Sequence, residues 1–258
     1  MSNPALSLSR AERLAALRAE VRALESAGAA QSRECLPFGI ESIDDRLAGG
    51  GLAVAALHEM SGERPGLSDD AAATLFAAAI AGRRAEAMDG GTVLWALARR
   101  DLFAPALAQI GLPPDRVLYA ECGNDEDVLA VMEEGLRHGG LAAVVGEAGR
   151  VPIAATRRLQ LAAEEGGTMA LMVKRWRRNG EDPLAAPSTA VTRWRLACAP
   201  SRILAVPGVG RPRWRLTLAR QRGGEPHLWT MESPDAEGRL ALLPPSERGE
   251  DQERRAAA

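Results

Sequence analysis

The sequence predicts an α/β fold, with a mostly parallel sheet flanked by helices and an antiparallel extension toward the carboxyl end. Near-continuous apolar runs of strand length recur between residues 52 and 174, and patterns of helical length separate them. This alternation is typical of a parallel sheet that is covered on both faces. After residue 190 the runs alternate apolar and polar side chains, which indicates that the sheet continues with antiparallel strands.

The composition indicates one principal domain with small appendages. The chain has 258 residues, a net charge of −2 and ordinary apolar and charged fractions, so it can bury one substantial core. No apolar run approaches the length of a membrane span and no signal peptide is evident, so we expect a cytoplasmic protein. The three cysteines are widely spaced, which favours structural thiols over a disulfide or a metal site.

The first 34 residues predict an amphipathic helix followed by a linker. Ser9 and Glu12 form a capping box, and a narrow apolar stripe follows and ends near Gly28. The stripe consists of Leu14, Leu17, Val21 and Leu24. It can dock on its own domain or on a neighbouring subunit, and spacing alone does not separate the two.

Residues 35–232 predict the core. The expected parallel strands are Leu52–Leu57, Thr92–Ala98, Arg116–Ala120, Leu141–Val145 and Thr168–Lys174. The expected helices cover Ala71–Arg83, the region around Leu102, Leu107 and Ile110, a segment capped by Asn124, and Ile153–Glu164. Right-handed crossovers connect such strands.

Beyond Lys174 the pattern changes. Residues 177–190 predict a mobile surface loop, and strands are expected at Val191–Cys198, Arg213–Arg222 and Leu228–Met231. Alternation along these strands puts Trp194 and Trp214 on the face opposite their flanking arginines, so both indoles are predicted to be core residues. Residues 233–258 predict a partly disordered tail, with Leu240, Leu242 and Leu243 as its last anchors.

The stretch from Glu59 to Asp70 stands where a nucleotide-binding domain has its phosphate loop, after a strand and before a helix. A working loop reads G-x-x-x-x-G-K-[ST], and no such motif exists in a chain with thirty-one Arg and a single Lys. Gly62 and Gly66 keep the frame, but Ser68, Asp69 and Asp70 replace the phosphate-binding residues. Two carboxylates there would repel a triphosphate. We favour a capping role for these three residues at the start of the helix.

The segment from Leu36 to Met60 resembles the entry to the ATPase core of RecA-type recombinases, through the motif G-I-x-S-I-D-x-R-L-x-G-G-G-L. The likeness extends to about Met231. The whole chain is more similar still to the ImuA family, through the E-M-S-G-E loop, the segment T-V-L-W-A-L-A-R-R-D-L-F-A-P-A-L and the late W-R-L and R-P-R-W-R-L strands. Members of this family are RecA-like and SulA-related. They are induced by DNA damage and encoded beside an inactive Y-family polymerase relative, ImuB, and an error-prone replicative-type polymerase.

The resemblance therefore implies a role in damage-induced mutagenesis, with the ImuB-like protein and the error-prone polymerase as partners. RecA and single-stranded DNA are further partners that it implies. Where RecA has a catalytic acid after its second strand, this chain has Ala98, Arg99 and Arg100, and Glu147 stands in place of a metal-supporting Asp. We expect no ATP hydrolysis and no cofactor.

The resemblance leaves open whether this chain contacts DNA as RecA does. In RecA-like cores the segments after the fourth and fifth strands face nucleic acid. The arginines there include Arg150, Arg157 and Arg158, and the cluster Lys174, Arg175, Trp176, Arg177 and Arg178 follows. Such a cluster suits a single-stranded backbone with one stacked base. The alternative is a solvated face with an edge-anchoring Trp.

The sequence thus favours a RecA-like accessory or scaffold protein of translesion synthesis that has lost its ATPase chemistry and self-associates or docks through its N-terminal helix. Two other functions stay open. One is a DNA-dependent ATPase of the recombinase type, against which the missing Lys argues. The other is a SulA-like inhibitor of cell division, for which kinship is the only support.

Overall fold

The computed structural model describes residues 34–177, 180–201, 207–208 and 210–243, together with Arg13 and Ala16. Its elements in the first half are β1 (Cys35–Leu36), α2 (Glu41–Asp44), β2 (Leu52–Ala53), β3 (Leu57–Gly62), α3 (Leu67–Ala87), β4 (Val93–Leu97), α4 (Ala104–Ala108), the 3₁₀ turn η1 (Pro114–Arg116) and β5 (Val117–Glu121). The second half contributes α5 (Asp125–His138), β6 (Ala143–Ala148), α6 (Ile153–Gly166), β7 (Met169–Lys174), β8 (Thr192–Ala199), β9 (Arg213–Gln221), β10 (His227–Glu232) and β11 (Ala241–Leu242).

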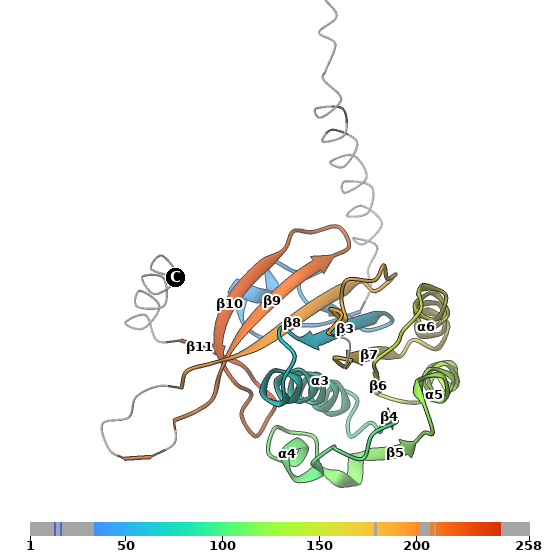
Figure 1. The fold of residues 1–258 in the computed structure, drawn as a ribbon, viewed down its shortest axis with the longest axis horizontal. Coiled ribbons are helices and arrows are strands. Elements are labelled where there is room, and N and C mark those ends of the chain that lie inside the picture. Colours follow the sequence, from blue (N-terminus) through green and yellow to red (C-terminus); the bar gives the residue numbers. More distant parts are fainter. Residues whose placement is uncertain are drawn as a thin grey trace, which may run out of the picture.

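A nine-stranded sheet organises the described chain, in the order β11-β10-β9-β8-β3-β7-β6-β4-β5. The strands from β8 to β5 run parallel, and β9, β10 and β11 continue the sheet antiparallel. Figure 1 shows α3 and α4 on one face of the parallel part and α5 and α6 on the other. The α/β fold, its mostly parallel sheet and its antiparallel end are confirmed, consistent with a RecA-like core.

Two strand assignments differ from the prediction. The strand expected at Val191–Cys198 is β8, and it pairs parallel with β3 rather than antiparallel. The run expected as one strand, Leu52–Leu57, is divided: β2 pairs with β1, and the sheet strand β3 starts at Leu57 and continues through Gly62. Every residue of β3 is buried, including His58, Glu59 and Ser61, because each of these polar side chains finds an internal partner.

An aromatic cluster fills the core between α3 and the late strands. Trp194 is fully buried and its ring lies 5.6 Å from Phe76, 5.9 Å from Phe38 and 6.2 Å from Trp229. Trp214 is buried to 3% exposure. The prediction that both strand tryptophans are core residues is confirmed. Offset aromatic contacts of this kind add to the stability that burial alone provides.

Helix α5 begins where its local signal places it, whereas α3 extends beyond the predicted Ala71–Arg83 and covers Leu67–Ala87. Asn124 caps α5 as predicted, since its side-chain oxygen accepts hydrogen bonds from the backbone N–H groups of Glu126 and Asp127. Gly139 ends α5 in the left-handed conformation, with φ of 70°. In the expected tail, Leu240 and Leu243 are buried while Leu242 is 42% exposed. Residues 244–258 lie outside the described part.

Residues 177–190 were expected to be a mobile surface loop. The connection that contains them, segment 175–191, has no helix or strand among its described residues. It crosses from the end of β7 to the start of β8 and is attached to the core at several points. Leu184 and Ser188 are buried, and Asp182 accepts two hydrogen bonds from the guanidinium of Arg195. These contacts hold the segment against the carboxyl ends of the parallel strands.

Candidate functional site

The connection between β3 and α3 stands where a phosphate loop was expected, and it is short. Because β3 continues through Gly62, only residues 63–66 join it to a helix that already starts at Leu67. Gly66 is the N-cap residue and no side chain caps the helix, so the capping role predicted for Ser68 was wrong. Asp69 and Asp70 do lie in the first turn, where carboxylates interact favourably with the helix dipole.

Gly62 brings the strand and the helix into direct contact. A Cβ added to Gly62 would lie 2.9 Å from both the carbonyl carbon of Asp69 and the backbone nitrogen of Asp70. The Gly62 carbonyl accepts a hydrogen bond of 2.9 Å from the indole Nε1 of Trp176. A phosphate cradle needs an open loop whose N–H groups point into free space. At Gly62 the start of α3 and the Trp176 indole take up the adjacent space, whereas a Cβ on Gly66 would meet nothing within 4 Å. The poor fit to a nucleotide and its Mg²⁺ therefore comes from Ser68, Asp69 and Asp70, which stand where the phosphate-binding Lys and Thr would be.

The two aspartates at the start of α3 differ, because Asp69 has partners within the protein and Asp70 has a buried oxygen without one in the described part of the chain. Asp69 is 3% exposed and accepts hydrogen bonds from Arg64 Nε at 3.0 Å and from the Cys198 backbone N–H at 2.9 Å. Asp70 has a buried Oδ1 that no described residue hydrogen-bonds. Desolvation by burial raises the pKa of the Asp70 carboxyl. Both carboxyl groups stand where a working loop has the side chains that bind phosphate and Mg²⁺, and neither supplies a positive charge.

Glu147, at the end of β6, is also bound within the protein. It is 5% exposed, and its carboxylate accepts hydrogen bonds from Trp95 Nε1 at 2.8 Å and from Arg175 Nε at 2.7 Å. Both carboxylate oxygens are therefore used before any metal arrives. In the part of the chain that the structure describes, no group of three His, Cys, Asp or Glu side chains is arranged to hold a metal ion. After β4, Arg100 pairs with Glu121 at 2.7 Å on the surface.

Lys174, a predicted DNA contact, is inside the protein. Its side chain is 2% exposed and its ammonium lies 3.3 Å from Glu59 Oε1. Glu59, fully buried, also accepts hydrogen bonds from Ser188 Oγ at 2.7 Å and from Arg193 Nε at 2.8 Å. Desolvation lowers the pKa of Lys174. A buried ammonium cannot contact a phosphate backbone, so the DNA role expected of Lys174 is corrected.

The pattern analysis missed this buried cluster of Glu59, Lys174, Ser188 and Arg193. Its members come from β3, β7, the 175–191 segment and β8, and they stand up to 134 positions apart in the chain. One local signal existed. Arg193 lies on a strand with buried neighbours, and a charged residue in such a place requires a partner of opposite charge.

The other residues that were predicted to contact DNA differ in solvent exposure. Arg175 has an 11% exposed side chain that pairs with Glu147, and Trp176 is half-buried. Arg177 is 48% exposed and lies 3.7 Å from Glu181. Arg157 and Arg158 are exposed on α6, where Arg158 pairs with Glu133 at 2.9 Å. Arg178 lies outside the described residues.

Two of the exposed arginines line a cavity at the amino ends of α5 and α6. The cavity has a volume of about 780 Å³, and Arg150 and Arg158 line it together with Asp125 and Leu129. Arg177 is adjacent, since its Cγ lies 3.2 Å from the position of a Cβ on Gly149. The structure thus brings Arg150, Arg158 and Arg177 to one end of the sheet, and it removes Lys174 and Arg175 from that surface.

The apolar stripe of the expected N-terminal helix, made of Leu14, Leu17, Val21 and Leu24, lies outside the described residues. Among the helices that the structure does describe, none combines the length and the apolar character that a bilayer crossing requires.

Comparison with known proteins identifies the family. No family model matches the chain. Two curated relatives named Protein ImuA, from Caulobacter vibrioides strains NA1000 / CB15N and ATCC 19089 / CIP 103742 / CB 15, are each 37% identical to it over 220 residues. The alignment covers 81% of this chain and 88% of each relative. Together with a sheet consistent with a RecA-like core, this similarity shows that the chain belongs to the ImuA family.

Proposed function

We propose that this protein is a non-catalytic, RecA-like scaffold of damage-induced translesion DNA synthesis in the cytoplasm. The observation that supports it best is the closed β3–α3 junction. The sheet is consistent with a RecA-like core, yet Ser68, Asp69 and Asp70 replace the phosphate-binding residues, and the start of α3 and Trp176 pack against Gly62. A fold retained without phosphate-binding residues is best explained by surfaces that bind other macromolecules.

The partners that we propose are those that family membership implies. They are an ImuB-like inactive Y-family polymerase relative and an error-prone replicative-type polymerase, with RecA as a further one. The predicted stripe of Leu14, Leu17, Val21 and Leu24 is a proposed contact surface, because a narrow apolar stripe on a charged helix needs a partner to cover it. Self-association through the N-terminal segment is part of the proposal.

Single-stranded DNA is proposed as a ligand of the exposed arginines at one end of the sheet. Among the described residues of the expected set, Arg150, Arg157, Arg158 and Arg177 are exposed, and the half-buried Trp176 precedes Arg177 in the chain. Their ion pairs with Glu133 and Glu181 are at the surface, where such pairs contribute little. Phosphates can therefore replace these carboxylates at small cost.

The decisive experiment is co-purification of the tagged protein with the two polymerases that accompany the family. We expect a ternary complex, since a scaffold binds more than one component. A variant with Leu14, Leu17, Val21 and Leu24 replaced by Ser should lose at least one of the two polymerases. Failure of the unaltered protein to retain either polymerase would remove the scaffold proposal.

The two competing functions have direct tests. A DNA-dependent ATPase would hydrolyse ATP in the presence of single-stranded DNA, and we expect no hydrolysis above background. A SulA-like inhibitor would cause filamentation on overexpression, and we expect cells to divide normally. Either positive result would replace the scaffold by the corresponding activity.

A further inference from the structure

The strands β8, β9 and β10 have one apolar face and one polar face. Three of their side chains, Trp194, Trp214 and Trp229, are buried on the side of the sheet that α3 covers. The side chains between them point to the other face, because successive residues of a strand alternate. The helices of that other face, α5 and α6, pack on β3, β4, β6 and β7, and Figure 1 shows both at a distance from β9 and β10. The polar face of β9 and β10 is therefore not covered by either helix.

Arginines occupy neighbouring positions on this polar face. The face includes the cross-strand pairs Arg195–Thr217, Arg215–Thr230 and, beyond a bulge, Arg193–Arg220. Arg195 and Arg215 are diagonal neighbours, since Thr217 follows Arg215 by two positions on the same strand. Positive charges at neighbouring positions of one face repel each other. We call the partly or fully exposed members, Arg195, Arg215 and Arg220, the arginine face.

The protein offsets two of these charges with carboxylates from connecting segments. Asp182, in the 175–191 segment, accepts hydrogen bonds of 2.8 and 2.6 Å from the two terminal nitrogens of Arg195. Glu63, between β3 and α3, accepts hydrogen bonds from Nε and Nη2 of Arg215. The arginine side chains stay accessible, at 24% exposure for Arg195 and 40% for Arg215. Exposed pairs of this kind contribute little to stability, so carboxylates from another molecule can compete with Asp182 and Glu63.

Arg220 has no such carboxylate. It is exposed, and among the described residues its guanidinium donates a hydrogen bond of 3.0 Å to the Ser188 carbonyl and pairs with no acid. Glu232, the acidic residue of β10, is already paired with Arg211 at 3.2 Å. Positive charge on the arginine face therefore exceeds the negative charge that the described residues around it supply.

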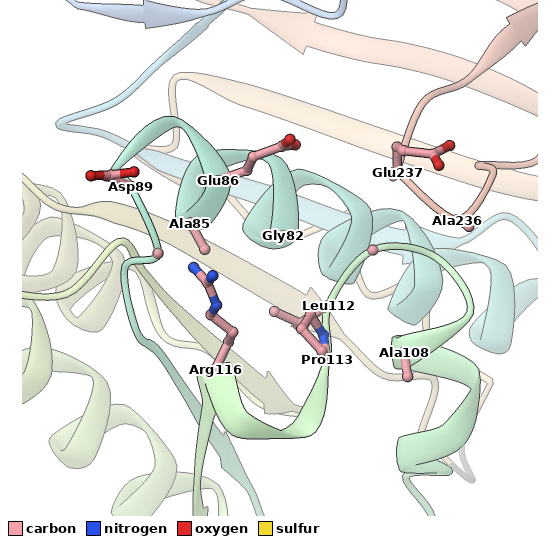
Figure 2. A pocket seen from close by; sticks show the side chains of 12 residues that line it. Gly82, Ala85, Glu86, Asp89, Ala108, Leu112, Pro113, Arg116, Ala236 and Glu237 are labelled. Atoms are coloured by element: carbon pink, nitrogen blue, oxygen red, sulfur yellow. The ribbon is translucent and has the colours of Figure 1, made fainter.

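The cavity at the end of α3 has the opposite balance of charge. It has a volume of about 450 Å³ and its lining includes Glu86, Asp89, Arg116 and Glu237. Figure 2 shows the guanidinium of Arg116 pointing toward the end of α3, with Asp89 and Glu86 near that end and Glu237 on the opposite side. Three carboxylates around one guanidinium disfavour an acidic ligand there. Of these two surfaces, the arginine face is the one that complements negative charge.

An acidic protein segment and a nucleic acid are the two candidate ligands, because carboxylate and phosphate both fit a guanidinium. Single nucleic-acid strands bind largely by stacking their bases on aromatic side chains. The strands β8, β9 and β10 contain no Phe or Tyr, and each Trp in them is buried on the opposite face, so they offer no ring to a base here. The pairs with Asp182 and Glu63 show instead that Arg195 and Arg215 are already oriented toward carboxylates.

We propose that the arginine face binds an extended segment of a partner protein in which acidic residues are clustered. Carboxylates of the segment bind Arg220, and they replace Asp182 and Glu63 on the two other arginines. Alternate side chains of an extended segment lie roughly 7 Å apart on one side, which matches the spacing of side chains on the sheet beneath it. This surface presupposes the proposed scaffold function, and it is separate from the predicted N-terminal stripe.

Binding of a labelled acidic peptide tests the proposal without any polymerase. Fluorescence anisotropy of fluorescein-labelled decaglutamate is measured with the full-length protein at low salt, where exposed charges are least screened. We expect decaglutamate to bind and the uncharged reference, decaglutamine, not to bind. Arg215→Ser/Arg220→Ser should weaken decaglutamate binding about tenfold, since charge-assisted contacts are lost. The control Arg100→Ser/Arg137→Ser removes two accessible, ion-paired arginines elsewhere and should bind like the unaltered protein.

A second double variant should increase the affinity. Asp182→Asn/Glu63→Gln removes the carboxylates that compete with the peptide for the arginine face, so decaglutamate should bind about threefold to tenfold more tightly. Its control, Glu121→Gln/Glu133→Gln, makes the same change in net charge on β5 and α5 and should leave the affinity unchanged. Thermal melts establish that each variant is folded.

The proposal is overturned if decaglutamate does not bind, if Arg215→Ser/Arg220→Ser keeps the full affinity, or if the two carboxamide variants bind equally tightly. Single-stranded oligothymidylate tests the other ligand class. If Arg215→Ser/Arg220→Ser weakens oligothymidylate binding as strongly as decaglutamate binding, the arginine face binds nucleic acid and not an acidic segment. Failure of co-purification with the polymerases would remove the scaffold function, whereas failure of decaglutamate to bind would remove only the arginine face.

Discussion

His58 is neutral and fully hydrogen-bonded inside β3. Its Nε2 lies 2.8 Å from the Ala53 carbonyl and its Nδ1 lies 2.7 Å from Thr192 Oγ1, which in turn accepts from Trp194 Nε1 at 2.7 Å. Nε2 therefore donates and Nδ1 accepts the Thr192 hydroxyl. Desolvation lowers the pKa of His58 from 6.5 to about 4. Protonation would cost the bond from Thr192 as well as the burial of a charge.

This lowered pKa makes stability depend on pH. The unfolded chain takes up a proton on His58 near pH 6.5, whereas the folded chain does so only near pH 4. The stabilisation that neutral His58 gives to the folded state is therefore complete above pH 6.5 and is lost as the pH falls from 6.5 to about 4. We expect a loss of roughly 3 kcal/mol across that window. Urea unfolding at pH 7 and pH 5 should show about 2 kcal/mol of this loss, because pH 5 lies about three fifths of the way through the window. His58→Gln should flatten the dependence, while His138→Gln, at an exposed position, should not; equal pH profiles for all three proteins would contradict the assignment.

Glu59 pairs with two buried cations, so substitution of Glu59 should destabilise the protein more than substitution of Lys174. Glu59→Gln leaves Lys174 and Arg193 without their counter-charge and should destabilise the protein by about 3–5 kcal/mol. Lys174→Met removes the ammonium whose pKa burial already lowers, and Glu59 keeps Arg193 and Ser188 as partners. This variant should cost much less. Chemical denaturation of both single variants and the double variant measures the difference, and equal losses for the two single changes would show that Lys174 is an essential partner.

At the scale of elements, the amino ends of α5 and α6 and the start of the 175–191 segment carry the proposed DNA surface. If Arg150, Arg157, Arg158 and Arg177 each neutralise one phosphate, affinity for single-stranded DNA should fall with salt at a log–log slope of about −0.7 per contact. Replacing all four by Ser should reduce the slope by up to about three on the same rule. Fluorescence anisotropy at several salt concentrations measures this.

Two control variants remove positive charges that lie outside the proposed DNA surface. Arg137→Ser removes a half-exposed arginine in the last turn of α5, and Lys174→Met removes a buried cation. Neither should change the slope. Trp176→Ala should weaken binding by roughly 1–3 kcal/mol if a base stacks on the ring. A fourfold variant that retains the full salt slope would place any DNA surface elsewhere.

For the whole molecule, the closed β3–α3 junction predicts indifference to nucleotide. A site occupied at a hundred times its dissociation constant adds about 2.7 kcal/mol to stability. For a domain of this size that corresponds to a Tm increase of about 5–10 °C. We expect no shift in thermal melts with ATP and Mg²⁺, because two carboxylates replace the phosphate-binding residues and the start of α3 packs directly against Gly62. A reproducible increase in Tm would mean that the junction opens.

The pattern of the sequence by itself determined the order of helices and strands, the tryptophan core and the lack of a phosphate-binding Lys. Each of these depends on local features: apolar periodicity, cap residues such as Asn124, or the absence of a residue type. Trp194 could be assigned to the core from strand alternation alone, and it is fully buried. Local periodicity is sufficient to predict burial wherever the position of a residue on its own helix or strand decides whether its side chain faces the core.

Only the tertiary structure decided where the charges lie. The strand before the loop was expected to end at Leu57, before Glu59, and Lys174 was expected to face DNA because the segment after the fifth strand does so in RecA-like cores. Both are buried because Arg193 and Ser188 reach Glu59 from 134 and 129 positions away in the chain. The parallel direction of β8 and the closed space at Gly62 likewise depend on distant partners. A charge can be buried when its counter-charge is built into the same core, and that pairing exists only after the chain has folded.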